Sequence, residues 1–187
     1  MKKIMFNDKY GLTQAVLEGR KTMTRRIMTP QPTWVNGDGH IYNDSKPSKY
    51  KVGDVVAVAQ SYKDTGNYPE SYIIDEFHPN IEFEAGWNNK MFVRADLMPY
   101  KIRITNVRVE RLQDISGDDC LREGILKKSN FPHKKSYPFY FNGGKHSWNN
   151  SFSTPRNAFA ALVDKVCGKG TWKANPYVFV YEFKLVK

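Results

Sequence analysis

Apolar residues recur with a helical period between residues 155 and 168. Their spacing of i, i+3, i+4 and i+7 is typical of a helix that buries one face, and the positions are Phe159, Leu162, Val163 and Val166. Thr154 is suited to cap the N-terminus, Pro155 to occupy the first turn and Gly168 to end the helix. The pattern predicts an amphipathic helix that covers part of the core.

Two shorter helices are predicted from their capping residues. The first follows Thr13, as the N-cap, and is closed by Gly19 in a left-handed conformation. The second begins at Ser116, where Asp119 three residues later resembles a capping box, and it ends at Gly124.

Apolar runs predict three strands. Residues 177–185 place an aromatic side chain at every second position, which makes one face of that strand a wall of the core. Residues 102–109 also alternate, but the phase slips at Asn106, which predicts a β-bulge within one long strand. Residues 55–59 follow a turn at Gly53 and Asp54 and form a predicted buried strand.

Three stretches lack a regular period, at about 29–49, 61–90 and 126–153. The second contains β-prone pieces at 72–74 and 81–83, and the third is predicted as a long structureless loop. Strands without regular helical crossovers favour an α+β fold built on a closed or nearly closed antiparallel β-barrel with a few short flanking helices. We expect a single domain over residues 1–187 that carries the three stretches as inserted loops.

The net charge is +10, from 29 basic and 19 acidic residues, and the pI is about 9.5. The excess is uneven, because residues 1–28 hold seven basic and two acidic residues and residues 127–187 hold eleven and two. Clustered positive charge is typical of a protein whose partner carries phosphate, so we expect a nucleotide or a nucleic acid. A basic surface without a dedicated partner is the alternative.

Composition argues against several other classes. No run approaches the roughly 20 apolar residues of a membrane span, and the first residues lack the apolar stretch of a secretory signal. Cys120 and Cys167 provide neither a disulfide framework nor a CxxC motif, and the four histidines lack metal-ligand spacing. We therefore expect a cytoplasmic protein with no membrane contact, no metal and no cofactor, and we favour a monomer.

The densest candidate site is the segment from residue 20 to residue 26, RKTMTRR. An amine whose pKa is lowered by burial or by neighbouring cations can take a proton from a hydroxyl, which makes Lys21 a candidate base and Thr24 a candidate nucleophile. Residues three apart converge only where the chain turns, so this mechanism requires a bend. The candidate substrate-binding residues of the segment are Arg20, Thr22, Arg25 and Arg26. A solvated basic stretch is the alternative.

Glu123 is the candidate general acid. It is predicted to end the second short helix, where the negative end of the helix dipole disfavours a carboxylate and favours a carboxyl that keeps its proton. A surface glutamate beside a glycine C-cap is the alternative.

The stretch 126–153 supplies further candidate binding residues, because aromatic side chains stack on bases and lysines contact phosphates. These candidates are Lys134, Lys135, Tyr137 and Trp148. The alternative is that the aromatic side chains fix the loop onto the barrel.

Four collinear segments resemble the ASCH domains, a branch of the PUA-like superfamily. Residues 19–26 match the signature GRKTxTRR, and residues 50–55 resemble the motif y-x-x-GD. Residues 104–124 resemble the block ITxVRVERLQDIS…A-x-x-EG of bacterial and phage members, and residues 172–183 resemble W-x-x-NPWVWVIEF. Together the four segments cover about half of the chain.

The resemblance implies a PUA-like β-barrel with a cleft lined by the GRKTxT segment. One bacterial branch comprises N4-acetylcytidine amidohydrolases, and its base, nucleophile and acid fall on Lys21, Thr24 and Glu123. Other members are RNA binders or ribonucleases. Larger members read WVRE-[ST]-W after the GD, whereas this chain has AVAQSY at 57–62, which places a neutral Gln60 in the cleft wall as a candidate binding residue.

The leading hypothesis is a protein that recognises a cytidine-type base, free or in RNA, in a basic cleft and hydrolyses an N4-acyl amide. The first alternative is a non-catalytic binder of single-stranded or modified nucleic acid. The second is a metal-independent ribonuclease that uses His133 or His146 together with Lys21.

Overall fold

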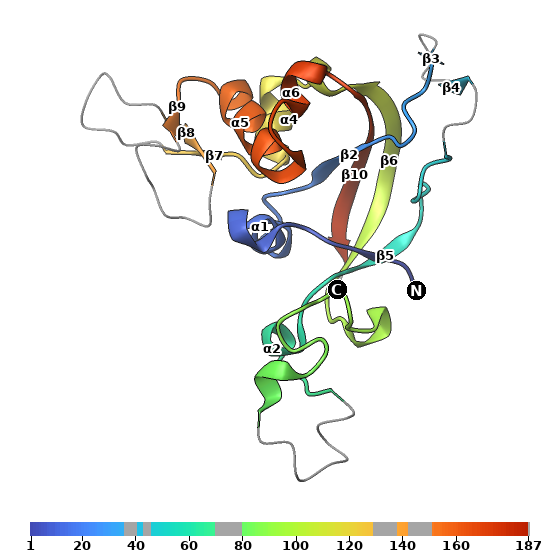
Figure 1. Cartoon of the computed structure of the whole chain (residues 1–187), viewed down its shortest axis with the longest axis vertical. Coiled ribbons are helices and arrows are strands. Elements are labelled where there is room, and N and C mark those ends of the chain that lie inside the picture. The colour runs from blue at the N-terminus through green and yellow to red at the C-terminus, as the bar shows by residue number, and fades with distance from the viewer. Residues whose placement is uncertain (36–40, 43–45, 70–79, 129–137, 142–150, 187) are drawn as a thin grey trace.

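The computed structural model describes residues 1–35, 41–42, 46–69, 80–128, 138–141 and 151–186. Its main sheet has the strand order β1-β5-β6-β10-β2 (Figure 1). These strands are β1 (Lys3–Ile4), β2 (Met23–Ile27), β5 (Val55–Val58), β6 (Lys101–Arg111) and β10 (Tyr177–Val186). Strands β1 and β5 run parallel, and the other three pairs are antiparallel. The α+β class is therefore confirmed, with a mixed rather than a purely antiparallel sheet.

Strands β6 and β10 form the centre of this sheet. The ladder shifts between Glu182 and Phe183, which pair with Asn106 and Ile104 and leave Thr105 as the extra residue. This confirms the predicted bulge. The aromatic face of β10 is a wall of the core, as predicted, since Phe179, Tyr181 and Phe183 are buried, and the opposite face is buried as well at Val178 and Val180. A central strand that is covered on both faces does not need to alternate.

Helices gather at one end of the long strands. In Figure 1, α4 (Gly117–Arg122), α5 (Pro155–Cys167) and α6 (Thr171–Ala174) lie together over that end, and α1 (Leu12–Leu17) lies below them. The predicted caps of two helices are confirmed, since Ser116 accepts a hydrogen bond from the Asp119 N–H and Thr154 accepts one from the Asn157 N–H. None of the described helices is long and apolar enough to cross a bilayer.

The cap predicted for the first helix is wrong. Helix α1 follows Gly11, and Thr13 lies inside it. The Thr13 hydroxyl donates to a carboxylate oxygen of Asp8, in the short helix η1 (Asp8–Tyr10), instead of capping the helix. The Thr13 oxygen accepts from Lys90 Nζ at 3.1 Å and from no backbone N–H of the described residues, because Thr13 is already inside the helix.

Two of the three irregular stretches contain short strands. Strands β3 (Trp34–Val35) and β4 (Ile41–Tyr42) pair within residues 29–49. Strands β7 (Leu126–Lys127), β8 (Phe139–Tyr140) and β9 (Ser151–Phe152) form a three-stranded sheet within 126–153, which corrects the prediction of a structureless loop. Two-residue strands are too short to leave a period in the sequence.

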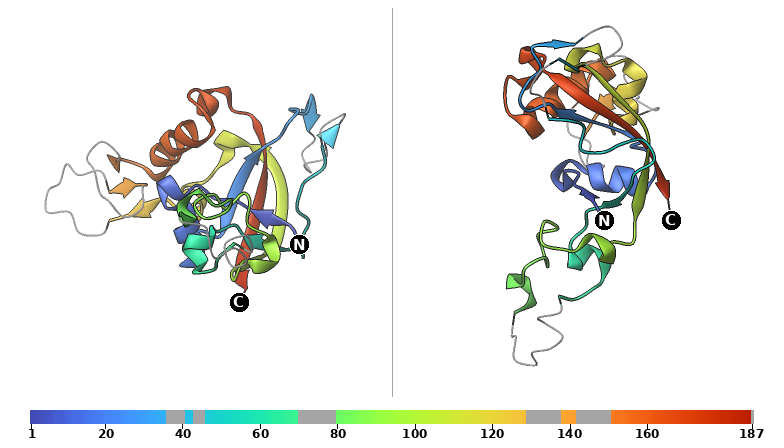
Figure 2. Two further views of the ribbon diagram at one scale, coloured as in Figure 1. Left: turned by 60° about the horizontal axis from the view of Figure 1, so that its bottom comes forward. Right: turned by 90° about the vertical axis from the view of Figure 1, so that its right-hand side faces the viewer.

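Residues 62–69 and 80–97 extend away from the long strands beyond β5 (Figures 1 and 2). This part contains α2 (Tyr62–Thr65) and the short 3₁₀ helices η2 (Ile81–Phe83) and η3 (Ala95–Leu97), so the β-prone piece at 81–83 is not a strand. The piece at 72–74 lies outside the described residues. A small second core forms here around Ala59, Tyr62, Val93 and Met98, apart from the main core.

The main sheet curls until its two end strands face each other. Two cavities are each lined both by residues of the N-terminal segment that follows β1 and by residues of β2. Arg26 on β2 reaches across this seam, where its Nη2 donates a hydrogen bond to the carbonyl oxygen of Met5. Within the described residues no backbone ladder joins β1 to β2. The candidate site lies along this seam.

Candidate active site

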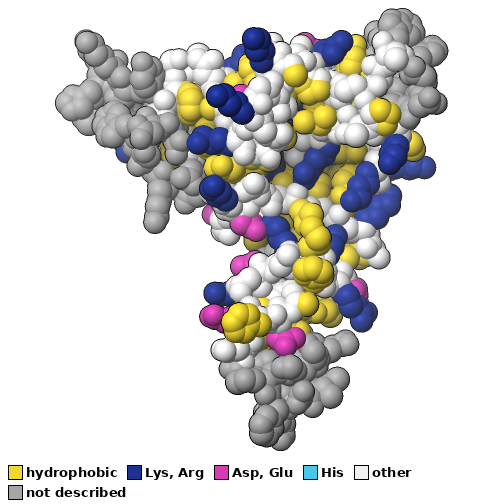
Figure 3. All heavy atoms as spheres, viewed as in Figure 1, with side chains coloured by type: hydrophobic (Ala, Val, Ile, Leu, Met, Phe, Trp, Pro, Cys, Tyr) yellow, Lys and Arg dark blue, Asp and Glu magenta, His cyan; other side chains and the backbone are white. Residues whose placement is uncertain are grey.

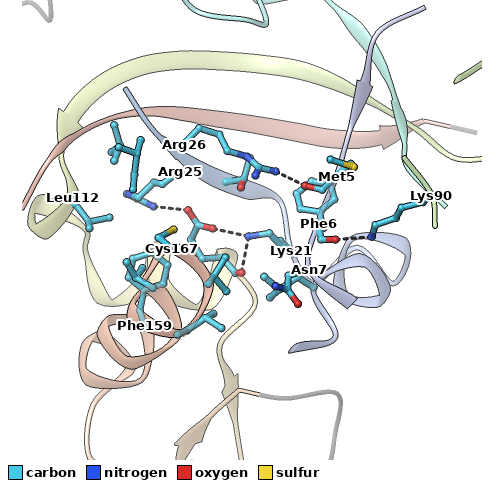
Figure 4. A pocket seen from close by; sticks show the side chains of 18 residues that line it. Met5, Phe6, Asn7, Lys21, Arg25, Arg26, Lys90, Leu112, Phe159 and Cys167 are labelled. Carbon is cyan, nitrogen blue, oxygen red and sulfur yellow. Dashed lines mark hydrogen bonds and ion pairs between the residues drawn. The ribbon is translucent and has the colours of Figure 1, made fainter. Parts of the chain in front are cut away.

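A cavity of about 590 Å³ lies between the N-terminal segment, β2 and α5 (Figure 4). Its volume falls in the range of about 300–1,000 Å³ that is typical of ligand pockets. The polar part of its lining contains Lys21, Thr24 and Glu123, the three residues that the sequence analysis singled out as catalytic candidates. The structure thus brings the predicted base, nucleophile and acid to one cavity.

The chain bends just before β2, as the candidate mechanism requires. Gly19 adopts a left-handed conformation (φ 73°) that ends α1. The Lys21 N–H then donates to the Ala15 carbonyl at 2.9 Å, so residue 21 still packs against the helix. Strand β2 begins at Met23. Lys21 therefore approaches the cavity from the turn, and Thr24 approaches it from the strand.

Lys21 and Glu123 form a buried ion pair. The Lys21 Nζ lies 2.5 Å from Glu123 Oε2 and donates a second hydrogen bond, of 2.7 Å, to the Glu123 carbonyl oxygen. Their side chains are 2% and 5% exposed. Glu123 is the C-cap of α4, as predicted. The glycine that follows, Gly124, has φ 105°, and a Cβ atom there would lie 3.7 Å from Lys21 Cδ.

A second cation contacts the same carboxylate from the opposite side. Arg25 donates to Glu123 Oε1 at 3.1 Å, and Figure 4 shows Lys21 and Arg25 converging on this group. The sequence-based expectation was a carboxyl that keeps its proton at the helix end. Here the two carboxyl oxygens of Glu123 accept hydrogen bonds from two cationic side chains, Oε2 from Lys21 and Oε1 from Arg25.

Arg25 belongs to an ion-pair network on the wall of the cavity. Its guanidinium also contacts Glu110 at 2.6 Å and Asp119 at 3.2 Å, and its side chain is 2% exposed. Arg108 and Arg122 continue the network to Glu182. Because its donors are engaged by carboxylates, Arg25 acts as a support for Glu123 in this arrangement, and it is not placed to hold a phosphate.

Burial lowers the pKa of the Lys21 ammonium below its ordinary value of 10.5. The carboxylate of Glu123 raises the pKa of Lys21, whereas the positive charges of Arg26 and Arg25 lower it, and the net direction is downward. A lysine in this environment gives up its proton more readily than a surface lysine, which is what a general base requires.

Thr24 and Arg26 present their side chains from the same strand. Thr24 is buried, and its hydroxyl makes no hydrogen bond to any residue that the structure describes. Arg26 lies two positions further along β2, and its guanidinium lies 5.8 Å from the centre of the Phe6 ring. Lys21 Nζ lies at the same distance from that ring. The lining of the cavity therefore combines an unengaged hydroxyl with two cations.

The structure places the remaining sequence candidates elsewhere. Arg20 is exposed and pairs with Glu18 at 2.5 Å, and the Thr22 hydroxyl accepts a hydrogen bond from Arg122, so neither lines the cavity. Gln60 is buried beside the second core and does not line the cavity, and within the described residues its Oε1 has no partner. The other candidates lie outside the described residues: Lys134, Lys135, Tyr137, Trp148, His133 and His146.

Several cavity residues were not predicted from the sequence. Phe6 comes from the N-terminal segment, and Lys90 reaches the cavity from the stretch 61–90, where its Nζ contacts Asp8 at 2.7 Å. Val166 was expected on the buried stripe of α5, but it is 40% exposed and lines the opening. The apolar stripe of α5 therefore includes Val166 as a residue of this site, although the sequence analysis assigned it to the core.

Among the described residues, no group of three or more His, Cys, Asp or Glu side chains is arranged to hold a metal ion. The polar groups that line this cavity include an amine, a carboxyl group, a hydroxyl, guanidinium groups and the thiol of Cys167. Such a set can transfer protons and form a covalent ester. Comparisons with protein-family models, with curated proteins and with solved structures found no match to this chain.

Proposed function

We propose that this protein is a PUA-like ASCH hydrolase that removes an acyl group from N4 of a cytidine-type base. The observation that carries the proposal is the buried Lys21–Glu123 pair in the wall of the cavity that Thr24 also lines. The curled sheet, whose end strands face each other across a seam, supports the barrel that the resemblance implies.

The short hydrogen bond between Lys21 and Glu123 supplies both the base and the acid. Transfer of one proton along it, from Nζ to Oε2, converts an ammonium and a carboxylate into a neutral amine and a neutral carboxyl group. Burial favours the neutral forms because it disfavours charge. The pair thus holds a single mobile proton that it can donate from either end.

In the acylation half of the reaction, neutral Lys21 takes the proton of the Thr24 hydroxyl while the oxygen attacks the acyl carbon. The carbon–nitrogen bond then breaks, and Glu123 donates its proton to the leaving amino group. The products are an acyl ester on Thr24 and the deacylated base. Lys21 is now an ammonium and Glu123 a carboxylate, which is the ion pair that the structure contains.

Hydrolysis of the ester reverses these proton transfers. Glu123 takes a proton from water as the water oxygen attacks the acyl carbon, and Lys21 returns a proton to the Thr24 oxygen as it leaves. The acid is released and both side chains are neutral again. In each half of the reaction, the negative charge that develops on the acyl oxygen lies near Arg26, whose guanidinium lines the cavity.

The experiment that tests this proposal is a chromatographic assay of the purified protein with N4-acetylcytidine. We expect cytidine and acetate as products, and we expect Lys21→Ala and Glu123→Gln each to lower kcat by about 10²–10⁴-fold, because each removes a proton-transfer group. Lys165→Ala and Glu82→Gln change the same residue types outside the cavity and should retain full activity. No turnover by protein that is shown to be folded would contradict the proposal.

A further inference from the structure

A second cavity, of about 720 Å³, lies on the other side of the bridge between Arg26 and Met5. Both cavities are lined by Met5, Arg26 and Ile27, so these residues form part of the boundary between the two. Residues of the segment 46–50, which precedes β5, line one side of the second cavity. Residues of β10 line its floor.

The lining of this second cavity is cationic. It contains Lys3, Arg26, Lys46 and Lys49, and in the part of the chain that the structure describes it contains no Asp or Glu. Lys3 donates to three backbone carbonyls, those of residues 90, 91 and 93, and is held in place by them. Lys46 and Lys49 are exposed, and neither pairs with a carboxylate of the described residues.

This charge pattern is the opposite of the pattern in the first cavity. There, Lys21 and Arg25 are each matched by carboxylates. Figure 3 shows Lys and Arg side chains gathered on the right-hand side of the molecule, beside hydrophobic ones. A concave site lined by several positive charges, with no carboxylate among its described lining residues, attracts an anion, and phosphate is the anion for which lysine and arginine are best suited.

The floor of the second cavity is aromatic. It contains Tyr50, Phe179 and Tyr181, with the rings of Tyr50 and Tyr181 packed edge to face at 5.2 Å. The Tyr50 hydroxyl donates to the Lys3 carbonyl oxygen at 2.9 Å, which fixes this floor to the N-terminal strand. A cavity with an apolar floor and a cationic rim fits a group that joins a flat or sugar-like body to a phosphate.

Strand β2 connects the two cavities with one row of side chains. Residues 24, 26 and 28 fall on one face of an extended chain, at intervals of about 6.6 Å. Thr24 lines the first cavity, Met28 lines the second, and Arg26 lines both. Arg26 is therefore the residue of this row that a group in the first cavity and a group in the second cavity can both contact.

We infer that the second cavity binds a phosphate group that is attached to the cytidine undergoing deacylation, so that a nucleotide or a strand is a better substrate than the free nucleoside, which is still hydrolysed. This inference rests on the proposed function, because it takes Thr24 as the position of the acyl group. Lys46 and Lys49 are the principal phosphate contacts, since they are exposed and pair with no carboxylate of the described residues, and Arg26 is shared between the two parts of the substrate.

The test compares three substrates: N4-acetylcytidine, its 5′-monophosphate and a short single-stranded oligoribonucleotide with one internal N4-acetylcytidine. We expect the phosphate-bearing substrates to have a kcat/KM at least about tenfold above that of the nucleoside, as one or more charge-assisted contacts would give. A higher value for the monophosphate than for the oligoribonucleotide identifies a mononucleotide substrate, and the reverse order identifies a strand.

Two double variants that replace lysines by glutamates, one in the second cavity and one elsewhere on the surface, test the role of the cavity charge. In Lys46→Glu/Lys49→Glu the preference for phosphate should fall to about one, because attraction is replaced by repulsion. Lys169→Glu/Lys173→Glu makes the same change in net charge at exposed positions outside both cavities, and its preference should equal that of the native protein. A native preference near one, or equal preferences in the two double variants, overturns the inference.

A binding measurement separates this inference from the proposed function. Calorimetry with cytidine and cytidine 5′-monophosphate does not depend on turnover. If no substrate is hydrolysed but the monophosphate binds at least about tenfold more tightly in a way that needs Lys46 and Lys49, the phosphate site stands and the hydrolase proposal falls. If the nucleoside is hydrolysed and the monophosphate has no advantage in rate or binding, the hydrolase stands and the phosphate site falls.

Discussion

Lys21 and Glu123 lie 102 positions apart in the sequence, yet the Nζ of one is 2.5 Å from the Oε2 of the other inside the protein. Removing two charges from water is costly, and a buried ion pair often stabilises a fold no better than apolar side chains of similar size. This pair also lines a cavity together with an unengaged hydroxyl. Perturbed ionisable groups in a cavity are typical of active sites, so the location of the pair points to chemistry and not to stability.

The two partners of this pair should contribute unequally to stability. Glu123→Leu leaves the buried Lys21 ammonium with only a backbone carbonyl, so we expect a loss of about 3–5 kcal/mol in the free energy of unfolding. Lys21→Met leaves the carboxylate paired with Arg25 and should cost less. The double variant should lose less than the sum of the two. Urea denaturation of all three variants provides the measurement, and additive losses would show that the two groups are not paired.

Hydrolytic activity should be lost as the pH is raised, and the loss should occur at a pH below the ordinary pKa of lysine. The reaction needs one proton on the Lys21–Glu123 pair, and burial, assisted by Arg26 and Arg25, lowers the pKa at which Lys21 releases that proton. Activity should therefore fall as pH rises through a pKa below 10.5. Arg26→Gln removes one positive charge and should move this limb to higher pH. A limb that stays in place in Arg26→Gln would contradict this assignment.

Gly124 should tolerate alanine less well than Gly53 does. Both glycines have a positive φ, of 105° and 91°, so each substitution costs about 1–3 kcal/mol in backbone strain. A Cβ atom at residue 124 would also lie 3.2 Å from Leu12 and 3.7 Å from Lys21, whereas residue 53 has nothing within 4 Å. We expect Gly124→Ala to lower both the melting temperature and kcat more than Gly53→Ala does. Equal effects on kcat would mean that Lys21 does not depend on this close approach.

The cap of α4 should affect catalysis as well as stability. Ser116→Ala removes the hydrogen bond at the start of a six-residue helix that ends beside Glu123, and it should cost about 1 kcal/mol. Thr154→Ala removes the same kind of cap from the 13-residue α5 and should cost a similar amount. We expect kcat to fall in Ser116→Ala and to be retained in Thr154→Ala. Equal kcat values would show that α4 does not hold Glu123 in position.

The sequence correctly predicted those features of the fold that depend only on residues close to one another in the chain. The caps at Ser116 and Thr154 and the phase slip at Asn106 depend on neighbouring residues only, and each was confirmed. The cap predicted at Thr13 was wrong because the helix already begins at Leu12, after Gly11 in a left-handed conformation, and the sequence offered no signal for this earlier start. The strands β7, β8 and β9 were missed because two residues carry no period.

The residues of the candidate site also divide into those that the sequence predicted and those that depend on contacts between distant parts of the chain. Lys21, Thr24 and Glu123 were predicted from their chemistry and from the resemblance, and the structure gathers them at one cavity. The role of Arg25 could not be predicted, since its carboxylate partners come from β6 and α4, far along the chain. Phosphate binding was expected at the RKTMTRR segment in general. The geometry leaves only Arg26 of that segment facing both cavities.

The most direct test of the hydrolase is a comparison of Thr24→Ser, Thr24→Ala and Thr105→Ala with N4-acetylcytidine as substrate. Thr24→Ser keeps the nucleophilic oxygen and should retain measurable turnover, whereas Thr24→Ala removes it and should reduce turnover to the uncatalysed rate. Thr105 is exposed at the bulge of β6, and its alanine variant should match the native protein. Turnover by Thr24→Ala at the native rate would contradict the assignment of Thr24 as the nucleophile.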